Sequence, residues 1–306
     1  MKGRRMCTIS RLGHRLPLIL LLLGFLGSGC TVIPPSVQRT NGIAYGHRGE
    51  HTLGLDVIRP RHPNGVGVLL LVSGAWRSRP PGGFPTWPFS SLLRRGYTMF
   101  YIYHVPQPKV TVMEIAEDMH RAVRFVRHNA GEYGIDPQRL GVTGGSAGGH
   151  LSLLLATRGA PGPADAPDPV DRESSAVQAV AIFYPVTDLL NLGASTQNAG
   201  DGGPPKGFRK AFGPQSTNLP VWKVIGHETS PIYYITTNLP PILIYHSDKD
   251  TLVPLEQSER FQGLARSMGC TVDVVVHHGG GHGWLTMPFD VPHFRDWFDR
   301  HLRKKP

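Results

Sequence analysis

A serine lies between glycines in the stretch Gly144-Gly145-Ser146-Ala147-Gly148. The residues directly before it form a short β-branched run, and those directly after it have the composition of a helix. A sharp turn from strand to helix needs small residues two before and two after its tip, and Gly144 and Gly148 supply them. The serine hydroxyl is then exposed, and the helix N-terminus behind it favours developing negative charge. This pattern predicts that Ser146 is a nucleophile.

A serine hydroxyl is a poor nucleophile unless a base takes its proton and a third group orients that base. An apolar run at residues 242–246 leads into an acidic loop that contains Asp248 and Asp250. A loop at the carboxyl end of a sheet strand is where ligand chemistry collects in open α/β folds. Both aspartates are therefore candidates for the acid. The alternative for either is a turn-forming or capping role.

The candidate base follows the next apolar run, at residues 272–276. Glycines surround His282, which suits a loop that lifts an imidazole towards the tip of another strand. His282 also lies 32 residues beyond Asp250, with a strand between them. We therefore expect His282 to be the base. His277 and His278 lie nearer the end of the strand and are expected to be structural or to line the site.

Three histidines this close together also raise the question of a metal site. His277, His278 and His282 have no nearby carboxylate at the spacing that zinc ligands show. The sequence therefore predicts no metal, and a serine mechanism needs no cofactor.

Acyl transfer passes through a tetrahedral oxyanion, which backbone N–H donors stabilise by about 3 kcal/mol each. One donor is expected at Ala147, directly after the serine. The second is expected in the loop that closes the apolar run 66–72, namely Ser73-Gly74-Ala75-Trp76. Glycine in this loop allows the backbone to approach a substrate closely.

The first 29 residues have the features of a targeting signal. A basic front without acidic residues precedes an apolar core from Leu16 to Leu26, which is too short to span a bilayer. Gly27-Ser28-Gly29 then precede Cys30, an arrangement that resembles a bacterial lipoprotein signal, in which the cysteine is lipidated. An ordinary secretory signal with an incidental cysteine is the alternative. Either reading predicts an extracytoplasmic protein, anchored to a membrane through Cys30 or secreted.

Net charge and cysteine content argue against nucleic-acid binding and against an internal disulfide. The chain has 32 Lys and Arg against 22 Asp and Glu, and five of the basic residues lie in the signal, so the remainder has a net charge of +5. No cluster of Lys and Arg stands out, and nucleic-acid binding has little support. Only Cys270 lies beyond the signal and Cys30, so no internal disulfide is expected.

Apolar runs typical of strands buried on both faces alternate with helical patterns. The helical patterns cover residues 112–130, 255–268 and the C-terminal region around Phe294 and Trp297. This alternation predicts an α/β fold, with a mostly parallel sheet covered by helices on both faces. The apolar runs are residues 66–72, 98–103, 140–143, 179–184, 242–246 and 272–276, preceded by a strand pair at 43–46 and 53–58.

The predicted organisation has three parts. Residues 1–29 are the signal, residues 30–41 are a polar, proline-bearing tether, and residues 42–306 are one α/β domain. An insertion around 190–231 is rich in Gly and Pro and carries scattered aromatic residues. A disordered insertion is one interpretation, but the aromatics favour a partly ordered cap over the site.

With these residues considered together, the chain resembles the α/β-hydrolase superfamily. Within it, the chain is similar to acetylxylan and feruloyl esterase-like, hormone-sensitive-lipase-like and prolyl-oligopeptidase-like serine hydrolases. The resemblance runs from about Leu53 to Leu302. Its anchors are Leu55–Pro60, Gly74–Ser78, Asp136–Leu140, Gly145–His150, His246–Asp250 with Val253-Pro254, and Gly281–Gly283.

The resemblance implies the α/β-hydrolase fold and assigns the acid to Asp250, four residues after a strand-end histidine. It also implies oxyanion donors at Gly74 or Ala75 together with Ala147. One departure concerns the oxyanion loop. Such proteins usually carry His-Gly-Gly, with a histidine that orders the loop, where this chain has Val72-Ser73-Gly74.

The expected function is that of a serine hydrolase that cleaves carboxylic esters through an acyl-enzyme. The resemblance implies small-molecule or glycan-linked esters, such as acetyl or feruloyl groups on a polysaccharide. A prolyl-oligopeptidase-like peptidase is one alternative, although such proteins usually carry a large propeller that has no counterpart before residue 53. A catalytically silent binding protein on a hydrolase scaffold is the other, and only the altered loop at Val72-Ser73 supports it.

Overall fold

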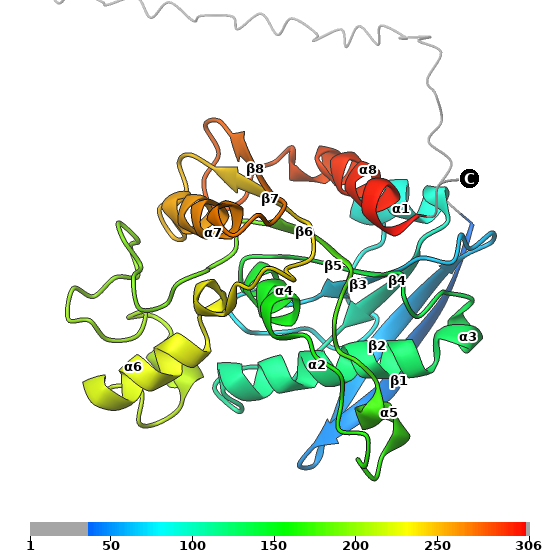
Figure 1. Cartoon of the computed structure of the whole chain (residues 1–306), viewed down its shortest axis with the longest axis horizontal. Coiled ribbons are helices and arrows are strands. Elements are labelled where there is room, and N and C mark those ends of the chain that lie inside the picture. Colours follow the sequence, from blue (N-terminus) through cyan, green and yellow to red (C-terminus); the bar gives the residue numbers. More distant parts are fainter. Residues whose placement is uncertain (1–35, 304–306) are drawn as a thin grey trace, which may run out of the picture. The chain divides into compact units, whose positions relative to one another are not determined.

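The computed structural model describes residues 36–303. An eight-stranded sheet lies at the centre, in the order β1-β2-β4-β3-β5-β6-β7-β8 (Figure 1). β1 pairs antiparallel with β2, and β2 with β4, while the pairs from β4 onwards are parallel. The strands are β1 (Val37–Arg48), β2 (His51–Pro60), β3 (Gly67–Leu71), β4 (Thr98–Ile102), β5 (Leu140–Gly145), β6 (Ala179–Phe183), β7 (Ile242–Ser247) and β8 (Val272–His277). The predicted α/β class with a mostly parallel sheet is confirmed.

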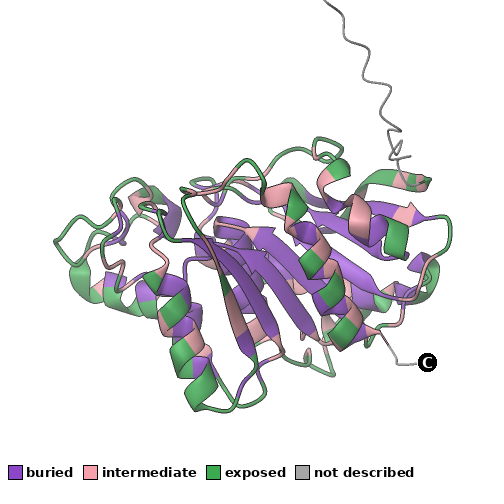
Figure 2. Cartoon of the chain, turned by 90° about the horizontal axis from the view of Figure 1, so that it is seen from above, coloured by how far each residue is buried: buried purple, intermediate pink, exposed green. Residues whose placement is uncertain are grey.

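Helices cover both faces of the sheet. α1 and α8 pack on one face, and α2, α4 and α7 pack on the other, so two apolar cores form (Figure 1). The α-helices are α1 (Ser90–Arg95), α2 (Val112–His128), α3 (Ala130–Tyr133), α4 (Ala147–Arg158), α5 (Pro169–Arg172), α6 (Leu219–Glu228), α7 (Glu256–Ser267) and α8 (Val291–Leu302). Four 3₁₀ turns are described as well: η1 (Trp87–Phe89), η2 (Arg209–Phe212), η3 (Pro231–Tyr234) and η4 (Met287–Phe289). Figure 2 shows the buried strands between helices whose outer sides are exposed.

Sequence features account for the burial of the central strands and for the start and the buried side of α2. β3, β4 and β6 are buried along their whole length, as expected for central strands between two helical layers. α2 begins at a capping box in which Thr111 and Glu114 satisfy each other's backbone N–H groups. Its buried residues recur at helical spacing, which fits the periodicity that predicted this helix.

The predicted tether overlaps the first strand. β1 begins at Val37, so residues 37–41 belong to the sheet rather than to a linker. A buried carboxylate explains this. Asp56 on β2 accepts hydrogen bonds from Arg39 at 2.8 Å and from the Gly42 N–H at 3.0 Å, and these bonds hold the segment against β2. The signal at 1–29 and Cys30 lie outside the described residues.

The insertion at 190–231 is partly regular in structure. It contains η2 and α6, whose Phe212 and Trp222 are buried and belong to the larger apolar core of the domain. Their rings pack edge to face with centroids 5.1 Å apart. The aromatic residues that favoured a cap in the sequence are therefore those that attach it to the domain.

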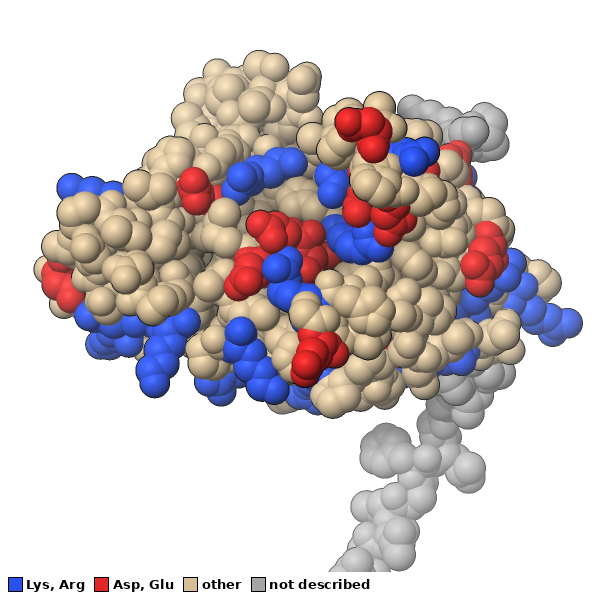
Figure 3. All heavy atoms as spheres, turned by 90° about the horizontal axis from the view of Figure 1, so that it is seen from below, with Lys and Arg blue, Asp and Glu red and all other residues tan. Residues whose placement is uncertain are grey.

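On the face drawn in Figure 3, acidic and basic side chains are interspersed, and no broad field of one sign covers it. This distribution fits the modest net charge beyond the signal. None of the helices between residues 36 and 303 is both long and apolar enough to cross a membrane.

Candidate active site

Ser146 occupies a strained turn between β5 and α4. Its φ of +55° and ψ of −119° lie outside the regions that residues with side chains ordinarily adopt. The flanking glycines allow this turn. A Cβ on Gly144 would lie 2.6 Å from the carbonyl carbon of Gly148, and a Cβ on Gly148 would lie 2.5 Å from the carbonyl oxygen of Leu71. Only glycine at both positions lets α4 approach β5 and β3 this closely.

Three side chains form one hydrogen-bonded chain at the carboxyl edge of the sheet. The Ser146 Oγ lies 2.8 Å from the His282 Nε2, and the His282 Nδ1 lies 2.7 Å from the Asp250 Oδ2. Because a carboxylate only accepts, the Nδ1–H of His282 donates to Asp250. Nε2 is then free to accept the Ser146 hydroxyl proton. The structure thus brings together the predicted nucleophile, base and acid, which are separated by up to 136 residues in sequence.

Asp250 is buried, yet its surroundings favour the charged form. Burial by itself raises the pKa of this carboxyl, but hydrogen bonds with His246 and His282 and from the Val253 N–H outweigh burial and hold the pKa well below its usual range. The second carboxylate oxygen accepts the N–H groups of Leu252 at 3.0 Å and Val253 at 2.9 Å. Asp250 is therefore a fixed anion behind His282.

Asp248, the other candidate acid, belongs to a separate turn. Its carboxylate accepts the Gly279 N–H at 2.9 Å and contacts the His278 Nδ1 at 2.9 Å. The His277 ring stacks on Trp284, with centroids 4.4 Å apart. In residues 36–303, no group of three His, Cys, Asp or Glu side chains is arranged to hold a metal ion.

The predicted oxyanion loop, Ser73-Gly74-Ala75-Trp76, forms a tight turn after β3. Gly74 and Arg77 exchange two backbone hydrogen bonds of 2.9 Å, and Ala75 and Trp76 between them both have φ of +53°. These values correspond to a type I′ turn, which costs strain for residues other than glycine. The Gly74 N–H is used within the turn, whereas the Ala75 N–H takes part in neither bond. The N–H of Ala147, the first residue of α4, has no acceptor within its own helix.

A histidine that the sequence analysis missed orders this loop. His104, just after β4, lies with its Nε2 2.9 Å from the Ser73 Oγ and its Nδ1 2.8 Å from the Val105 carbonyl oxygen. Burial lowers the pKa of His104 to about 4, so the ring is neutral. Its Nδ1–H then donates to Val105, and Ser73 donates to Nε2. This chain has no histidine at residues 72–74, where similar proteins usually carry one, and His104 from the loop after β4 contacts Ser73 instead. Its position after a predicted strand was the available signal.

A second histidine that the sequence did not reveal, His150, connects this turn to α4, the helix that follows Ser146. The Trp76 Nε1–H donates to the His150 Nδ1 at 3.2 Å, and the His150 Nε2 donates to the Thr229 carbonyl oxygen at 2.7 Å. Complete burial lowers the pKa of His150 to about 4, so this ring is neutral too. Phe208 and Phe212 pack against Trp76 with ring centroids 5.5 and 5.4 Å away. The oxyanion turn, α4 and the cap are therefore one packed unit.

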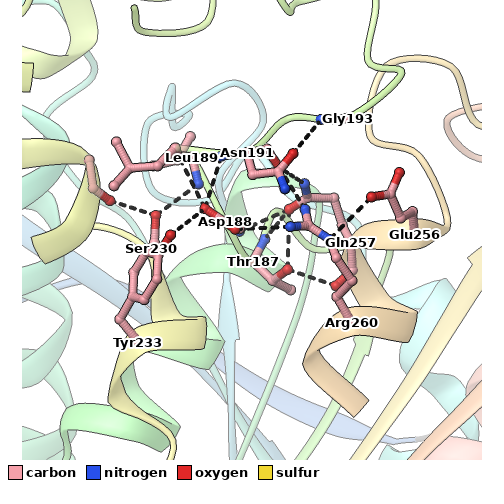
Figure 4. Close-up of polar contacts among 12 residues, drawn as sticks. Thr187, Asp188, Leu189, Asn191, Gly193, Ser230, Tyr233, Glu256, Gln257 and Arg260 are labelled. Carbon is pink, nitrogen blue, oxygen red and sulfur yellow. Dashed lines mark hydrogen bonds and ion pairs between the residues drawn. The ribbon is translucent and has the colours of Figure 1, made fainter. Parts of the chain in front are cut away.

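The start of the insertion is fastened to α7 by polar contacts (Figure 4). The Gln257 side chain accepts the N–H groups of Thr187 and Asp188, both at 2.9 Å, and donates to the Asn191 carbonyl oxygen at 2.8 Å. Arg260 forms an ion pair with Asp188 at 3.0 Å. Tyr233, in η3, donates to the same carboxylate at 3.2 Å. These contacts hold residues 187–191 in place. The residues that follow, beginning with Leu192, line one wall of the pocket.

A cavity of about 810 Å³ opens over Ser146 and His282. Its walls are mainly apolar. Leu189, Leu192 and Phe208 lie on the cap side, and Phe84, Trp87 and Met287 come from the loops around η1 and η4. None of the described residues that line it is Asp or Glu, whereas Arg77 and Arg79 are among them. A pocket of this size and character suits a small organic ligand or an acyl or alcohol group.

Ser146 lies in the turn after β5, Asp250 in the loop after β7 and His282 in the loop after β8, and this arrangement on one mostly parallel sheet is that of an α/β-hydrolase. The chain belongs to the BD-FAE family, whose model matches residues 55–264. Esterase LipQ of Mycobacterium tuberculosis is 33% identical over 240 residues, covering 76% of this chain and 53% of that protein. A probable isoprenylcysteine alpha-carbonyl methylesterase of Arabidopsis thaliana, ICMEL1, is 24% identical over 274 residues, covering 86% and 54%. The chain thus spans about half the length of these curated relatives.

Solved structures share the fold. A truncated carbohydrate esterase from gut microbiota superposes with a TM-score of 0.70 at 22% identity, covering 87% of this chain and 96% of that one. An acetyl ester-xyloside bifunctional hydrolase from Caldicellulosiruptor lactoaceticus has a TM-score of 0.66 at 22% identity, covering 88% and 95%.

Proposed function

We propose that the protein is a carboxylic-ester hydrolase that works through Ser146, His282 and Asp250. The observation that carries this proposal is the continuous hydrogen-bonded chain from the serine hydroxyl to a buried aspartate, with contacts of 2.8 and 2.7 Å. Family membership and the similarity to an esterase of Mycobacterium tuberculosis support it.

In the proposed reaction, the Ser146 Oγ attacks the ester carbonyl carbon while the His282 Nε2 takes the hydroxyl proton. The tetrahedral intermediate collapses when His282 passes that proton to the leaving alkoxide, which departs as an alcohol. Water then attacks the acyl-enzyme with His282 as base, and the products are a carboxylic acid and free Ser146. Asp250 holds the imidazole in the required tautomer and stabilises the imidazolium.

The oxyanion is proposed to bind the N–H groups of Ala147 and Ala75. Both residues line the pocket beside Ser146. Of the two loop candidates, Ala75 is preferred over Gly74 because the Gly74 N–H already donates to Arg77. Aligned donors of this kind are each worth about 3 kcal/mol of barrier.

The substrate and the location belong to the same proposal. Acetyl or feruloyl groups on a polysaccharide are the proposed substrates, supported by the likeness to a carbohydrate esterase and an acetyl ester hydrolase. The proposed location is extracytoplasmic, after removal of residues 1–29 and lipidation of Cys30, supported by the basic front, the apolar core and the small residues before Cys30. An ester panel with varied acyl groups, acetylated xylan and feruloylated oligosaccharides tests the substrate.

The decisive test of the chemistry uses Ser146→Ala. Hydrolysis of p-nitrophenyl acetate and labelling by a fluorophosphonate probe should both be lost, while the thermal unfolding midpoint stays near that of the parent protein. Ser152→Ala is the matched control, because Ser152 is buried in α4 and donates to the Gly148 carbonyl oxygen. If Ser146→Ala retains full activity or labelling, the proposed nucleophile is wrong.

A further inference from the structure

Three large apolar side chains are strongly exposed at one place on the surface. The exposed fractions are 96% for Leu285, 77% for Phe289 and 64% for Trp87, higher than for any other large apolar side chain in residues 36–303. Trp87 begins η1, Phe289 ends η4, and Leu285 lies two residues before η4. η1 and η4 contact each other, so the three residues share one region of the surface, here called the apolar rim.

The apolar rim is continuous with the pocket over Ser146. Trp87 itself lines the cavity, as do Met287 and Pro288 of η4. A ligand that enters the pocket on this side therefore passes the rim. The rim and the largely apolar pocket wall form one surface.

The segments that carry the rim are well anchored, so the exposure is not that of a loose loop. The Trp284 Nε1–H donates to the Asp290 carboxylate at 2.7 Å, and its ring stacks on His277. Within η4, the Phe289 N–H donates to the Thr286 carbonyl oxygen at 2.8 Å. Leu285 and Phe289 are thus held outwards by an ordered backbone. Exposed Trp, Phe and Leu in such a position favour burial in the boundary layer of a lipid surface.

The charged residues around the pocket are positive. Arg77 and Arg79 line it, and no acidic residue does so among those described. For neither arginine side chain does the structure of residues 36–303 record a hydrogen bond or an ion pair, whereas Arg48, Arg121 and Arg260 each pair with carboxylates. Guanidinium groups of Arg77 and Arg79, which line the same pocket as Trp87, complement a surface of anionic head groups.

We propose that the apolar rim docks the mouth of the pocket onto an anionic lipid surface, with Trp87, Leu285 and Phe289 inserting among the lipids. Arg77 and Arg79 supply the attraction to the head groups. Docking places the pocket opening at the interface, where esters with apolar groups are concentrated. It needs neither the nucleophile nor lipidation of Cys30.

The test is peptide-resolved hydrogen exchange on the full chain carrying Cys30→Ser, so that no acyl anchor is attached. It is measured with and without vesicles of phosphatidylcholine, alone or mixed with phosphatidylglycerol. The mixed vesicles should slow exchange in peptides that cover residues 84–90 and 284–290, and leave α6 unchanged. Protection confined to residues before Val37 would overturn the proposal, and so would equal protection by both kinds of vesicle.

Matched variants locate the contact. Trp87→Ser/Leu285→Ser/Phe289→Ser should weaken binding to the mixed vesicles about tenfold or more, because the buried apolar area is lost. Leu219→Ser/Val224→Ser/Leu264→Ser changes three exposed apolar residues away from the pocket and should bind like the parent. Thermal unfolding midpoints show that both sets of variants are folded. Equal binding by the two sets overturns the proposal.

Failure of the lipid proposal is distinguishable from failure of the proposed function. The Ser146→Ala chain should dock as well as the parent, since the rim does not include the serine. Fluorophosphonate labelling of the parent in the absence of vesicles tests the nucleophile alone. If the probe labels the protein but vesicles do not protect the rim from hydrogen exchange, only the docking proposal is overturned. If vesicles protect the rim but the probe does not label the protein, only the proposed hydrolase function is overturned.

Discussion

At the scale of single residues, the surroundings of two nearby aspartates differ sharply. Asp250 is buried, contacts His282 at 2.7 Å and accepts two backbone N–H groups, whereas Asp248 caps an exposed turn beside His278. The same type of side chain therefore contacts the predicted base at one position and stabilises a turn at the other. The difference arises because Asp250 faces the sheet edge while Asp248 faces solvent.

Asp250→Asn should lower kcat for p-nitrophenyl acetate by about 10⁴-fold, because an amide does not hold the imidazole in the tautomer that accepts the serine proton. Asp248→Asn is the matched control and should change kcat less than about threefold, since its carboxylate contacts only the turn. Steady-state kinetics and thermal unfolding are measured on both. Similar losses in the two variants would contradict the assignment of the acid.

At the scale of elements, close approach of α4 to β3 sets the position of Ser146. Gly148 lies where a Cβ would be 2.5 Å from a carbonyl oxygen of β3, so the contact tolerates no side chain. Gly131 in α3 has no atom within 4 Å of its would-be Cβ. Packing of α4 against β3 therefore requires glycine at position 148, whereas no packing contact requires glycine at position 131.

Gly148→Ala should destabilise the protein by about 2 kcal/mol or more, because backbone atoms on both sides must shift. It should also lower kcat, since α4 carries the Ala147 N–H. Gly131→Ala should leave stability unchanged or raise it by up to about 1 kcal/mol. Urea unfolding and ester hydrolysis are the measurements. A fully stable Gly148→Ala variant would show that the contact relaxes freely.

The predicted oxyanion turn is held by contacts from three elements. β3 leads into it, His104 from the end of β4 holds Ser73, and His150 from α4 holds Trp76. The cap contributes Phe208 and Phe212 to the same cluster. The strained turn is therefore maintained by packing around it rather than by its own residue preferences.

At the scale of the whole molecule, the pH dependence of the free energy of unfolding should reflect buried histidines that stay neutral inside the fold. Burial lowers the pKa of His104, His120 and His150 to about 4, against about 6.5 in an unfolded chain. Between these values the unfolded state binds more protons than the folded state. The free energy of unfolding should therefore fall as pH decreases from about 6.5 to about 4.

In His150→Gln, the free energy of unfolding should change less steeply with pH, by the contribution of one proton, since one buried imidazole is removed. The parent protein provides the reference slope. Urea unfolding at a series of pH values gives both slopes. An unchanged slope in His150→Gln would mean that this imidazole binds a proton inside the fold.

The fold and much of the site were predictable because their signals are local. Continuous apolar runs mark strands, and all six runs lie on parallel strands of the sheet. The expectation of burial on both faces is wrong for residues 272–276, because β8 is an edge strand and Val275 is 38% exposed. Glycine spacing around Ser146 and strand-end loops with Asp250 and His282 follow from the same local rules. The structure places these three residues in contact, while their catalytic roles remain predictions.

By itself, the sequence determined the order of the elements and the kinds of side chain that their ends present, because periodicity and turn chemistry act over a few residues. Only the tertiary structure showed that Asp250 rather than Asp248 contacts His282, that the Gly74 N–H is used within its turn while the Ala75 N–H is not, and that His104 holds Ser73. Each of these depends on which groups meet across strands and loops far apart in sequence. Hydrogen-bond partners of that kind are set by packing in three dimensions, which no local pattern encodes.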